Sequence, residues 1–570
     1  LAHLDHIPRS ELAHAVSSGA TGPTCTPPRS LSPRLASLLR PALRLRSGVS
    51  YRGHFAFGIV PGPRSACRST GVQSAPAGTR GMAVSPRLEL TSEEQQLFDT
   101  LLAASKQAGF PTTLRCAGGW VRDKLMGRAS DDIDVALDDA LGSAFAEAVN
   151  GYLAGQGQGV HSVAVIAANP GQSKHLETAR MRVHGLWLDL VNLRCEEYAA
   201  GSRIPAMRFG TPRQDAERRD FTINALFYNI NSGEVEDLTG RGLADLEAGV
   251  IRTPLPPRQT LLDDPLRALR AVRFAARFGF ELEESLVHAA AHPEIASALE
   301  QKVSRERVGT EVDGMLGGPK PVAALDLLRR LGLMHAVFGH DLGTDGRPGV
   351  AWEALRLLDL GLGREARRDL MAAAALLPVR EERVPAAKGR HTSLAASLLR
   401  TALKWPTRSG ERVEALHAAA PQLLQVLQEG LRGEDGAVGK ESLQVTLGRC
   451  LLALKDSWRE GCLLGALLGS PTDPAGTAEG CRSLVAAVGG WGLQGCWEWK
   501  PPVNGRRVMA LLGVSGKEVG PVMAAITDWQ LAQPGGSARE CEAWLLTQTR
   551  WAPSVREATA PEAGDGSVEK

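Results

Sequence analysis

The stretch that decides the fold is Gly118-Gly119-Trp120-Val121-Arg122-Asp123, followed after a short interval by Asp132-Ile133-Asp134. Two adjacent glycines let a phosphate group approach main-chain N–H groups, because no side chain stands in the way. The run from Asp132 to Leu137 is short, apolar and β-branched, which predicts a strand. We therefore expect a glycine turn that leads to a strand with acidic side chains.

Asp132 and Asp134 are candidate metal ligands. Residues two apart on a strand point to the same face, so the two carboxylates converge. Two hard oxygen donors, completed by phosphate oxygens and water, suit Mg²⁺. Each half of the pattern also has an ordinary interpretation, since Gly-Gly is usually a turn and Asp-x-Asp is usually a solvated strand edge.

The composition predicts a soluble globular protein of several domains. The chain has 570 residues, 43% of them hydrophobic, and no apolar run of membrane-spanning length, so no membrane partner is expected. The nine cysteines form no C-x-x-C pair, which favours reduced thiols over disulfides or a zinc site. The net charge is +2, but residues 1–88 alone carry +9, which leaves −7 on residues 89–570. A nucleic-acid partner must therefore bind to a local basic stripe.

Residues 1–84 are predicted to be a disordered organellar transit peptide. They are rich in Arg, Ser, Pro and Gly, and they contain no acid after Glu11. The composition does not separate mitochondrion from plastid, and a translated leader or a disordered basic tail is the alternative. Met82 is a candidate internal start, which would give a second form in the cytosol or nucleus.

From Leu90 the pattern is that of a small α/β sheet. A helix with an acidic first turn is predicted from Ser92, a strand over Leu114–Ala117, a helix over Ala140–Tyr152 and a strand in the run 163–168. Residues 201–215 are polar and predicted to form a loop.

Asp189 lies among apolar residues in the predicted strand Leu186–Arg194. A charge there needs a partner, and an ion pair with an arginine satisfies that need as well as a catalytic role does. A second polar group, Arg218-Arg219-Asp220 with Asn224, lies beside an apolar run. It is interpreted either as a nucleotide site or as the capped, salt-bridged start of a helix.

The segment Asp264–Arg277 predicts an amphipathic helix with Pro265 at its first position and Asp264 as its cap. Arginines recur every three or four residues, which places them in one stripe. The stripe suits phosphates, although a solvated helix face explains the same spacing. Farther on, Ser304 is a predicted cap, and Arg307 and Glu311 are a predicted i, i+4 pair.

In the order Gly118–Asp134, Arg218–Ala225, Val235–Leu246, Asp264–Arg277 and Ser304–Glu311, these stretches resemble motifs A to E of the class II nucleotidyltransferases. That family comprises CCA-adding tRNA nucleotidyltransferases and bacterial poly(A) polymerases, and the wording is nearest to the eukaryotic CCA-adding type. The resemblance implies an α+β fold, in which a small nucleotidyltransferase α/β head (90–255) precedes an all-helical neck (256–320) and a helical, tRNA-binding body and tail (321–550). Residues 551–570 are predicted to be disordered.

The resemblance also implies roles for individual residues. Asp189 becomes the third catalytic acid, and Asp264 with Arg267 becomes an amino-acid template for the incoming base. Cytosine and adenine each present an amine beside a ring acceptor, which matches a carboxylate and a guanidinium, whereas uracil and guanine mismatch both. The expected catalytic residues are Asp132, Asp134 and Asp189, and the expected nucleotide-binding residues are Gly118, Gly119, Arg122, Arg219, Asp220, Asn224, Asp264, Arg267, Arg270 and Arg273.

The implied activity is Mg²⁺-dependent addition of C, C and A to tRNA from CTP and ATP by a monomer. A poly(A) polymerase of the same superfamily and a tRNA-binding chaperone without catalysis are the alternatives. The intact aspartate pair argues against the chaperone. Beyond residue 320 the pattern is helical, with a loose resemblance to the family's tail segment in 501–523.

Overall fold

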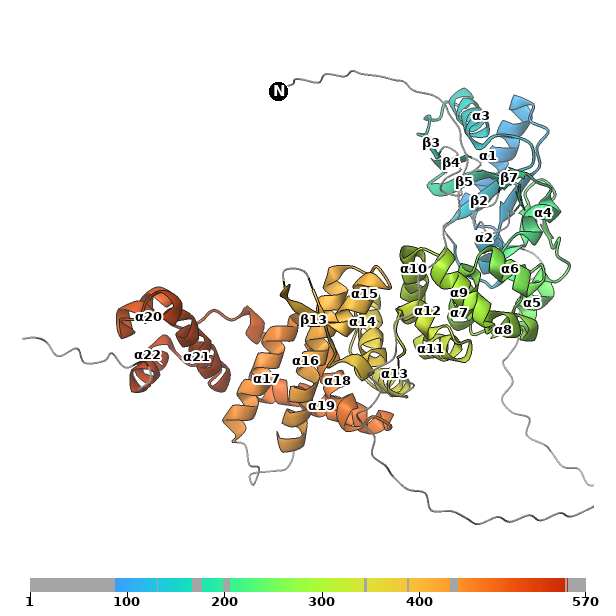
Figure 1. Cartoon of the computed structure of the whole chain (residues 1–570). Helices are drawn as coiled ribbons and strands as arrows, with labels where there is room; N and C mark the ends of the chain where they lie inside the picture. The colour runs from blue at the N-terminus through green and yellow to red at the C-terminus, as the bar shows by residue number, and fades with distance from the viewer. Residues whose placement is uncertain are drawn as a thin grey trace, which may run out of the picture. The chain divides into compact units, whose positions relative to one another are not determined.

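The computed structural model describes residues 88–130, 132–166, 177–197, 206–342, 346–386, 389–430, 439–548 and 551. The predicted transit peptide, the internal start at Met82 and all of the predicted disordered tail except Trp551 lie outside these residues. Within them, a mixed sheet with its helices is followed by segments that are mostly helical (Figure 1).

The head contains a seven-stranded sheet in the order β3-β4-β5-β2-β1-β8-β9. β2 and β5 are parallel, and the other neighbouring strands are antiparallel. The strands are β1 (Leu114–Ala117), β2 (Ile133–Leu137), β3 (Ala164–Ile166), β4 (Thr178–Val183), β5 (Leu186–Asn192), β8 (Phe227–Asn229) and β9 (Glu234–Glu236).

Helices α1 (Ser92–Ala108) and α3 (Gly142–Gly155) pack together, and α3 packs on β4 and β5 (Figure 1). The predicted start of α1 is confirmed: Thr91 and Glu94 form a capping box there, and Gly109 ends the helix with a positive φ of 71°. Alternate residues of β2, such as Ile133 and Val135, are buried in the core. The other face of the sheet carries the acidic residues of β2 and β5.

A loop is predicted over residues 201–215, and this prediction is wrong for the part that the structure describes. Strand β7 (Ala206–Phe209) pairs with β6 (Arg194–Glu197), and α4 (Pro212–Glu217) follows. Thr211 and Gln214 form a capping box with a proline in the first turn, so the polar residues start a helix. Residues 201–205 lie outside the described residues.

The neck is helical, as predicted, except for one strand. Its helices are α6 (Pro257–Asp263), α7 (Leu266–Phe278), α8 (Glu284–Ala290), α9 (Pro293–Lys302) and α10 (Arg305–Leu316). Strand β11 (Glu281–Leu282) pairs in parallel with β10 (Val250–Ile251), which follows α5 (Gly242–Ala248). This short pairing joins the neck to the head.

The body and tail are helical, as the resemblance implied. Helix α19 begins at Pro474, and Asp473 caps it by accepting a hydrogen bond from the Ala475 N–H. A two-stranded pair, β12 (Arg383–Pro385) and β13 (His391–Ser393), interrupts the helices. The helices are α11 (Pro321–Arg330), α12 (Met334–Phe338), α13 (Arg347–Leu357), α14 (Arg364–Ala375), α15 (Leu394–Thr401), α16 (Thr407–Gly430), α17 (Lys440–Leu454), α18 (Trp458–Gly469), α19 (Pro474–Gly490), α20 (Gly505–Leu512), α21 (Val519–Ala532) and α22 (Ala538–Thr547).

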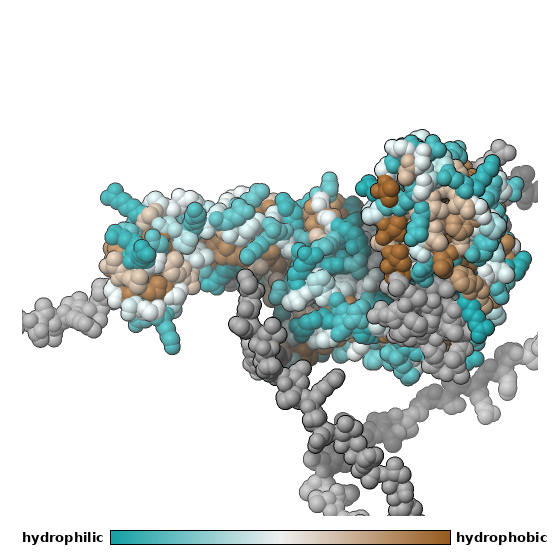
Figure 2. Space-filling model, turned by 90° about the horizontal axis from the view of Figure 1, so that it is seen from above, coloured by the Kyte–Doolittle hydropathy of each residue, from teal (hydrophilic) through white to brown (hydrophobic). Residues whose placement is uncertain are grey.

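The main cluster of buried apolar side chains runs from Leu97 in the head to Leu531 of α21, while the tail helices have a second core around Trp529. The surface in Figure 2 is mainly hydrophilic, with smaller hydrophobic areas. Among the described residues no single helix is long and apolar enough to cross a membrane. The bent pair formed by α20 and Gly516–Ala532 passes that test by length and composition only.

Gly309 of α10 tests the packing of neck against body. A Cβ on Gly309 would lie 1.7 Å from the carbonyl oxygen of Leu403, and Trp405 Nε1 donates to the Gly309 carbonyl at 3.0 Å. Gly309→Ala should therefore lower the free energy of unfolding by about 1–3 kcal/mol through overpacking. Gly489→Ala, at an exposed position of α19 with no atom near its Cβ, should be neutral or stabilising. Denaturant titration of both variants checks this, and equal stabilities would contradict it.

Candidate functional site

Gly118 is required by the close approach of an arginine. Its φ is 72° and ψ −123°, and its N–H donates to the Leu226 carbonyl at 3.1 Å. A Cβ at this position would lie 2.7 Å from Nη1 of Arg219. The turn therefore leads from β1 into α2 (Gly119–Leu125) and leaves room for the Arg219 guanidinium beside it.

The three expected catalytic acids gather on adjacent strands. Asp134 in β2 is directly in register with Asp189 in β5, and Asp132 lies exposed just before β2. Burial raises the pKa of Asp134 to about 6, repulsion by Asp132 and Asp189 adds to this, and Arg219 opposes it. Asp132 precedes the strand, so the register does not test its predicted convergence with Asp134, but it does place Asp134 beside Asp189.

Asp189 carries an unsatisfied oxygen. Its Oδ1 is buried without a hydrogen bond, and Nε of Arg180 lies 3.6 Å away. Burial raises the pKa of Asp189 and Asp132 raises it further, while Arg180 opposes the change. The sequence left open whether Asp189 pairs with an arginine. Arg180 is such a partner, but Oδ1 of Asp189 still lacks a hydrogen bond.

These acids suit a divalent cation by their chemistry. Charged oxygens that repel each other, one of them lacking a hydrogen bond, are stabilised by a hard cation such as Mg²⁺. Among the residues that the structure describes, which exclude Asp131, no three His, Cys, Asp or Glu side chains lie close enough to form a finished metal cluster. The cation would therefore draw the carboxylates together.

Asp215 lines a small cavity beside Asp134 and was not among the site residues predicted from the sequence. It is 1% exposed and accepts hydrogen bonds from Arg218 Nη2 at 2.5 Å, Arg219 Nη2 at 2.9 Å and the Arg194 main-chain N–H at 3.0 Å. Although burial opposes the shift, Arg219 and Arg218 hold the pKa of this carboxyl below its usual value. Its spacing of three and four residues from the two arginines on and after α4 was the available signal.

Asp220 joins the head to the neck. It accepts hydrogen bonds from Asn224 Nδ2 at 3.0 Å and Arg270 Nε at 2.8 Å. Burial opposes ionisation, but Arg270 and Asn224 lower the pKa of Asp220. The alternative of a helix start is wrong here, because Arg218 ends α4 and only a 3₁₀ turn, Thr222–Asn224, follows.

Arg122 is turned into the interior. It pairs with Asp123 at 2.8 Å, donates to Asn224 Oδ1, and its guanidinium lies 4.8 Å from the ring centre of Phe278 and 5.2 Å from that of Phe274. Burial lowers its pKa, and Asp123 opposes the change. In this structure Arg122 ties α2 to α7, where the sequence predicted contact with nucleotide.

Three arginines of the stripe on α7, Arg267, Arg270 and Arg273, are held by partners within the protein, so the interpretation as a solvated face is wrong for them. Arg267 Nη2 donates to the Arg218 carbonyl at 2.7 Å, Arg270 Nη1 lies 3.7 Å from Glu311, and Arg273 pairs with the same carboxylate at 2.5 Å. The predicted pair of Arg307 with Glu311 is also wrong, because Arg307 Nη2 donates to Asp264 Oδ2 at 2.7 Å.

Two details of helix capping differ from the prediction. Helix α7 begins at Leu266 with Pro265 as its cap residue, although Asp264 Oδ1 still accepts from the Leu266 N–H at 3.2 Å. Ser304 precedes α10 but makes no side-chain capping bond.

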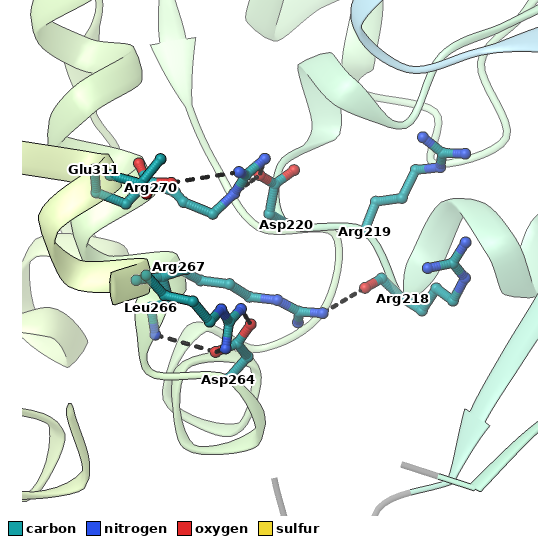
Figure 3. Close-up of a pocket in the computed structure, with 10 residues that line it drawn as sticks. Arg218, Arg219, Asp220, Asp264, Leu266, Arg267, Arg270 and Glu311 are labelled. Carbon is teal, nitrogen blue, oxygen red and sulfur yellow. Dashed lines mark hydrogen bonds and ion pairs between the residues drawn. The ribbon is translucent and has the colours of Figure 1, made fainter. Parts of the chain in front are cut away.

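Two cavities share Arg218 and Arg219. Figure 3 shows Arg267 reaching the main chain at Arg218 while Arg270 lies beside Asp220. The larger, of about 470 Å³, is lined by Arg218, Arg219, Asp220, Asp264, Leu266, Arg267, Arg270, Arg307, Thr310 and Glu311. The smaller, of about 210 Å³, is lined by Asp134, Ala136, Val191, Asn192, Arg194, Asp215, Arg218 and Arg219.

The expected nucleotide-binding residues thus fall into two groups. Five of them line the larger cavity: Arg219, Asp220, Asp264, Arg267 and Arg270. The others, Gly118, Gly119, Arg122, Asn224 and Arg273, line neither cavity. Of this second group, Gly118 closely approaches Arg219 and Asn224 contacts Asp220, while Arg273 pairs with Glu311, which also lines the larger cavity.

Comparison with known proteins finds two family models and several relatives that match this chain. A family model described as "Poly A polymerase head domain" matches residues 114–252, and one described as "Probable RNA and SrmB- binding site of polymerase A" matches residues 279–340. The mitochondrial CCA tRNA nucleotidyltransferase of Saccharomyces cerevisiae is 48% identical over 264 residues, which cover 44% of this chain and 48% of that enzyme. The chain thus spans about half the length of this relative and of its Candida glabrata counterpart.

Other similarities extend over more of the chain. The tRNA nucleotidyltransferase cca1 of Schizosaccharomyces pombe is 32% identical over 490 residues, covering 80% of this chain and 97% of that protein. The Thermotoga maritima CCA-adding enzyme complexed with tRNA has a similar fold, with a TM-score of 0.55, 20% identity, and coverage of 80% of this chain and 96% of that one. The Bacillus stearothermophilus CCA-adding enzyme in complex with CTP gives a TM-score of 0.55 at 22% identity, covering 81% and 98%.

The buried Asp215 predicts a pH-dependent loss of stability. Asp215→Asn should lower the free energy of unfolding by about 3 kcal/mol at neutral pH, because two arginines lose their buried partner. Because folding lowers the pKa of this carboxyl, its contribution is complete above the unfolded value of about 3.9 and is lost as the pH falls through the folded value.

Denaturant titrations of wild type and Asp215→Asn should therefore differ by a constant amount from neutrality to about pH 5, and by less below about pH 4. Asp359→Asn, at an exposed position, is the control and should change stability by less than about 0.5 kcal/mol. A difference that widens on acidification contradicts the assignment.

Proposed function

The chain belongs to the tRNA nucleotidyltransferase family, and on that basis we propose that it adds C, C and A to the 3′ ends of tRNA from CTP and ATP without a nucleic-acid template. The observation that carries the proposal is the pair of adjoining cavities, one holding Asp264 and Arg267 and the other Asp134, with Arg218 and Arg219 lining both. A nucleotide whose base lies in the first cavity can extend its triphosphate along these arginines toward the carboxylates.

Asp264 and Arg267 would select the base. The Asp264 carboxylate accepts a hydrogen bond from the amine of cytosine or adenine, and Arg267 donates a hydrogen bond to the adjacent ring nitrogen. Without nucleotide, Arg307 holds Asp264 and the Arg218 carbonyl holds Arg267. A matching base therefore replaces two existing partners, whereas uracil or guanine leaves both groups without one, at about 1–3 kcal/mol each.

Asp132, Asp134 and Asp189 would carry the chemistry. Nucleotidyltransferases of this superfamily use a divalent metal ion, and Asp132 and Asp134 would hold Mg²⁺ here. When bound, the ion supplies positive charge against the triphosphate and the attacking 3′-hydroxyl. Asp189, with its unsatisfied Oδ1, is suited to accept the proton of that hydroxyl. Arg219 balances the charge on the phosphates, and pyrophosphate leaves.

The cellular location is proposed from the names of two relatives. The curated relatives from two yeasts are named as mitochondrial, so we place this protein in the mitochondrion. The predicted division into head, neck, and tRNA-binding body and tail, with boundaries at 255 and 320, remains a proposal, as does the monomeric state.

The reaction itself is tested by supplying tRNA that lacks its last three nucleotides. We expect growth by three nucleotides with CTP and ATP, and no further growth. A long A tract would indicate a poly(A) polymerase, and binding without extension would indicate a tRNA-binding protein. Asp134→Asn should reduce turnover by on the order of 1,000-fold with tRNA affinity nearly unchanged. Turnover that survives this substitution would remove the carboxylate from the mechanism.

Base selection is tested by Arg267→Ala. The loss of one donor in the cavity should weaken discrimination of CTP and ATP against UTP and GTP by about 10-fold to 100-fold. Arg277→Ala is the matched control, because Arg277 is on the same helix but outside the lining of the cavity. Single-nucleotide incorporation rates measure both, and unchanged preference in Arg267→Ala would exclude it as a base reader.

A further inference from the structure

An exposed aromatic and two arginines continue the face of the sheet that carries the carboxylates. The strand register puts Asp134, Asp189, Arg180 and Ala164 in one row across β2, β5, β4 and β3. In the neighbouring row, Trp187 of β5 pairs with Arg182 of β4. Because side chains two apart share a face, Trp187, Arg180 and Arg182 point to the same side as Asp189.

This side of the outer strands is open, whereas the opposite side is the core. Trp187 is 45% exposed and the Arg180 side chain is 44% exposed. The intervening residues Leu188 and Met181 are buried in the main core. Nearer the centre of the sheet, a small apolar cluster around Ala136 and Phe227 covers the face. Among the described residues, this cluster reaches β5 at Val191 and includes neither Asp189 nor any residue of β4.

The arginines lie against the Trp187 ring. The guanidinium carbons of Arg180 and Arg182 are 5.1 Å and 5.9 Å from the ring centre. Arg182 Nε donates to the Gly185 carbonyl at 3.0 Å, which fixes the side chain beside the ring. An aromatic surface with adjacent guanidinium groups is the chemistry that binds single-stranded nucleic acid, by stacking on bases and contact with phosphates.

The position of Trp187 and the two arginines relative to the carboxylates determines which substrate they can contact. The smaller cavity extends from Asp134 toward the carboxyl ends of β2 and β5, where Ala136, Val191 and Asn192 line it. In-line transfer places the attacking hydroxyl and the leaving pyrophosphate on opposite sides of the transferred phosphorus. The attacking 3′ end must therefore come from the opposite direction, toward β4 and the amino end of β5, where Trp187 lies.

We propose that Trp187, with Arg180 and Arg182, forms a platform on which the 3′-terminal nucleotides of the acceptor RNA dock before extension. The ring stacks on a terminal base, and Arg182 contacts a backbone phosphate. This inference rests on the proposed function, since it names the site for that reaction's second substrate. Stacking tolerates any base, which the reaction requires, because the terminal base is that of the unextended RNA at the first addition and an added C at the next two.

Direct binding tests the platform without depending on turnover. An RNA hairpin with a single-stranded 3′ end and 2-aminopurine as its last nucleotide should lose fluorescence on binding wild type, because the base stacks. The quenching should disappear with Trp187→Ala and persist with Trp187→Phe. Trp187→Ala should also raise the KM for acceptor RNA about 10-fold and leave the KM for CTP unchanged.

Charge reversal tests the phosphate contact. Arg182→Glu should weaken RNA binding and reduce the dependence of log affinity on log salt concentration by about one contact. Lys106→Glu is the matched control, because this exposed residue is on α1, which packs on the core with α3, and it should behave as wild type.

The outcomes separate the platform from the reaction. Normal extension with unchanged RNA binding, quenching and KM in Trp187→Ala overturns the platform and leaves the proposed function intact. Quenching that depends on Trp187 without extension by wild type supports the platform and overturns the proposed reaction. Wild type that neither binds nor extends the RNA overturns both.

Discussion

The partly buried ionic contact between Asp220 and Arg270 is the constraint on which the site depends. It joins the segment after α4 to helix α7, fifty residues later in the chain, and Arg270 in turn faces Glu311 of α10. A charge removed from water requires a well-placed partner, so these three residues fix one another's positions. The arrangement determines where Asp264 and Arg267 lie relative to the carboxylates of the head.

The aspartates of the site form two pairs, which differ in whether arginines neutralise their carboxylates. Asp215 and Asp220 are each held by arginines, and their pKa values lie below the usual range despite burial. Asp134 and Asp189 instead face other acids, and their pKa values are raised. The first pair has its positive charge in the fold and acts as scaffold. The second pair has no arginine that fully compensates it, which is the condition for binding a metal ion.

The sequence predicted the parts of the site that depend on local spacing. The strand period placed Asp134 on the open face, and the embedded position of Asp189 indicated that its charge needed a partner. A local pattern does not reveal partners that are far apart in the sequence. The arginines of α7 were therefore interpreted as a phosphate-binding or solvated stripe, whereas Arg270 and Arg273 pair with Asp220 and Glu311. Arg307 was assigned to Glu311 by helical spacing, but Asp264 lies closer in space. Asp215 was readable from its spacing to two arginines, but its polar surroundings favoured a loop.

Recognition in the proposed mechanism is divided between the two sides of the acidic residues. On the side of the nucleotide cavities, hydrogen-bonding groups already have partners, so a base displaces them only if its edge offers equivalent donors and acceptors. On the β4 side, an open ring with adjacent guanidinium groups imposes no hydrogen-bond pattern. A template-independent enzyme needs this asymmetry. The incoming nucleotide must be one of two bases, whereas the end that receives it carries the RNA's own base at the first step and an added C at the later two, and one rigid binding mode does not serve both.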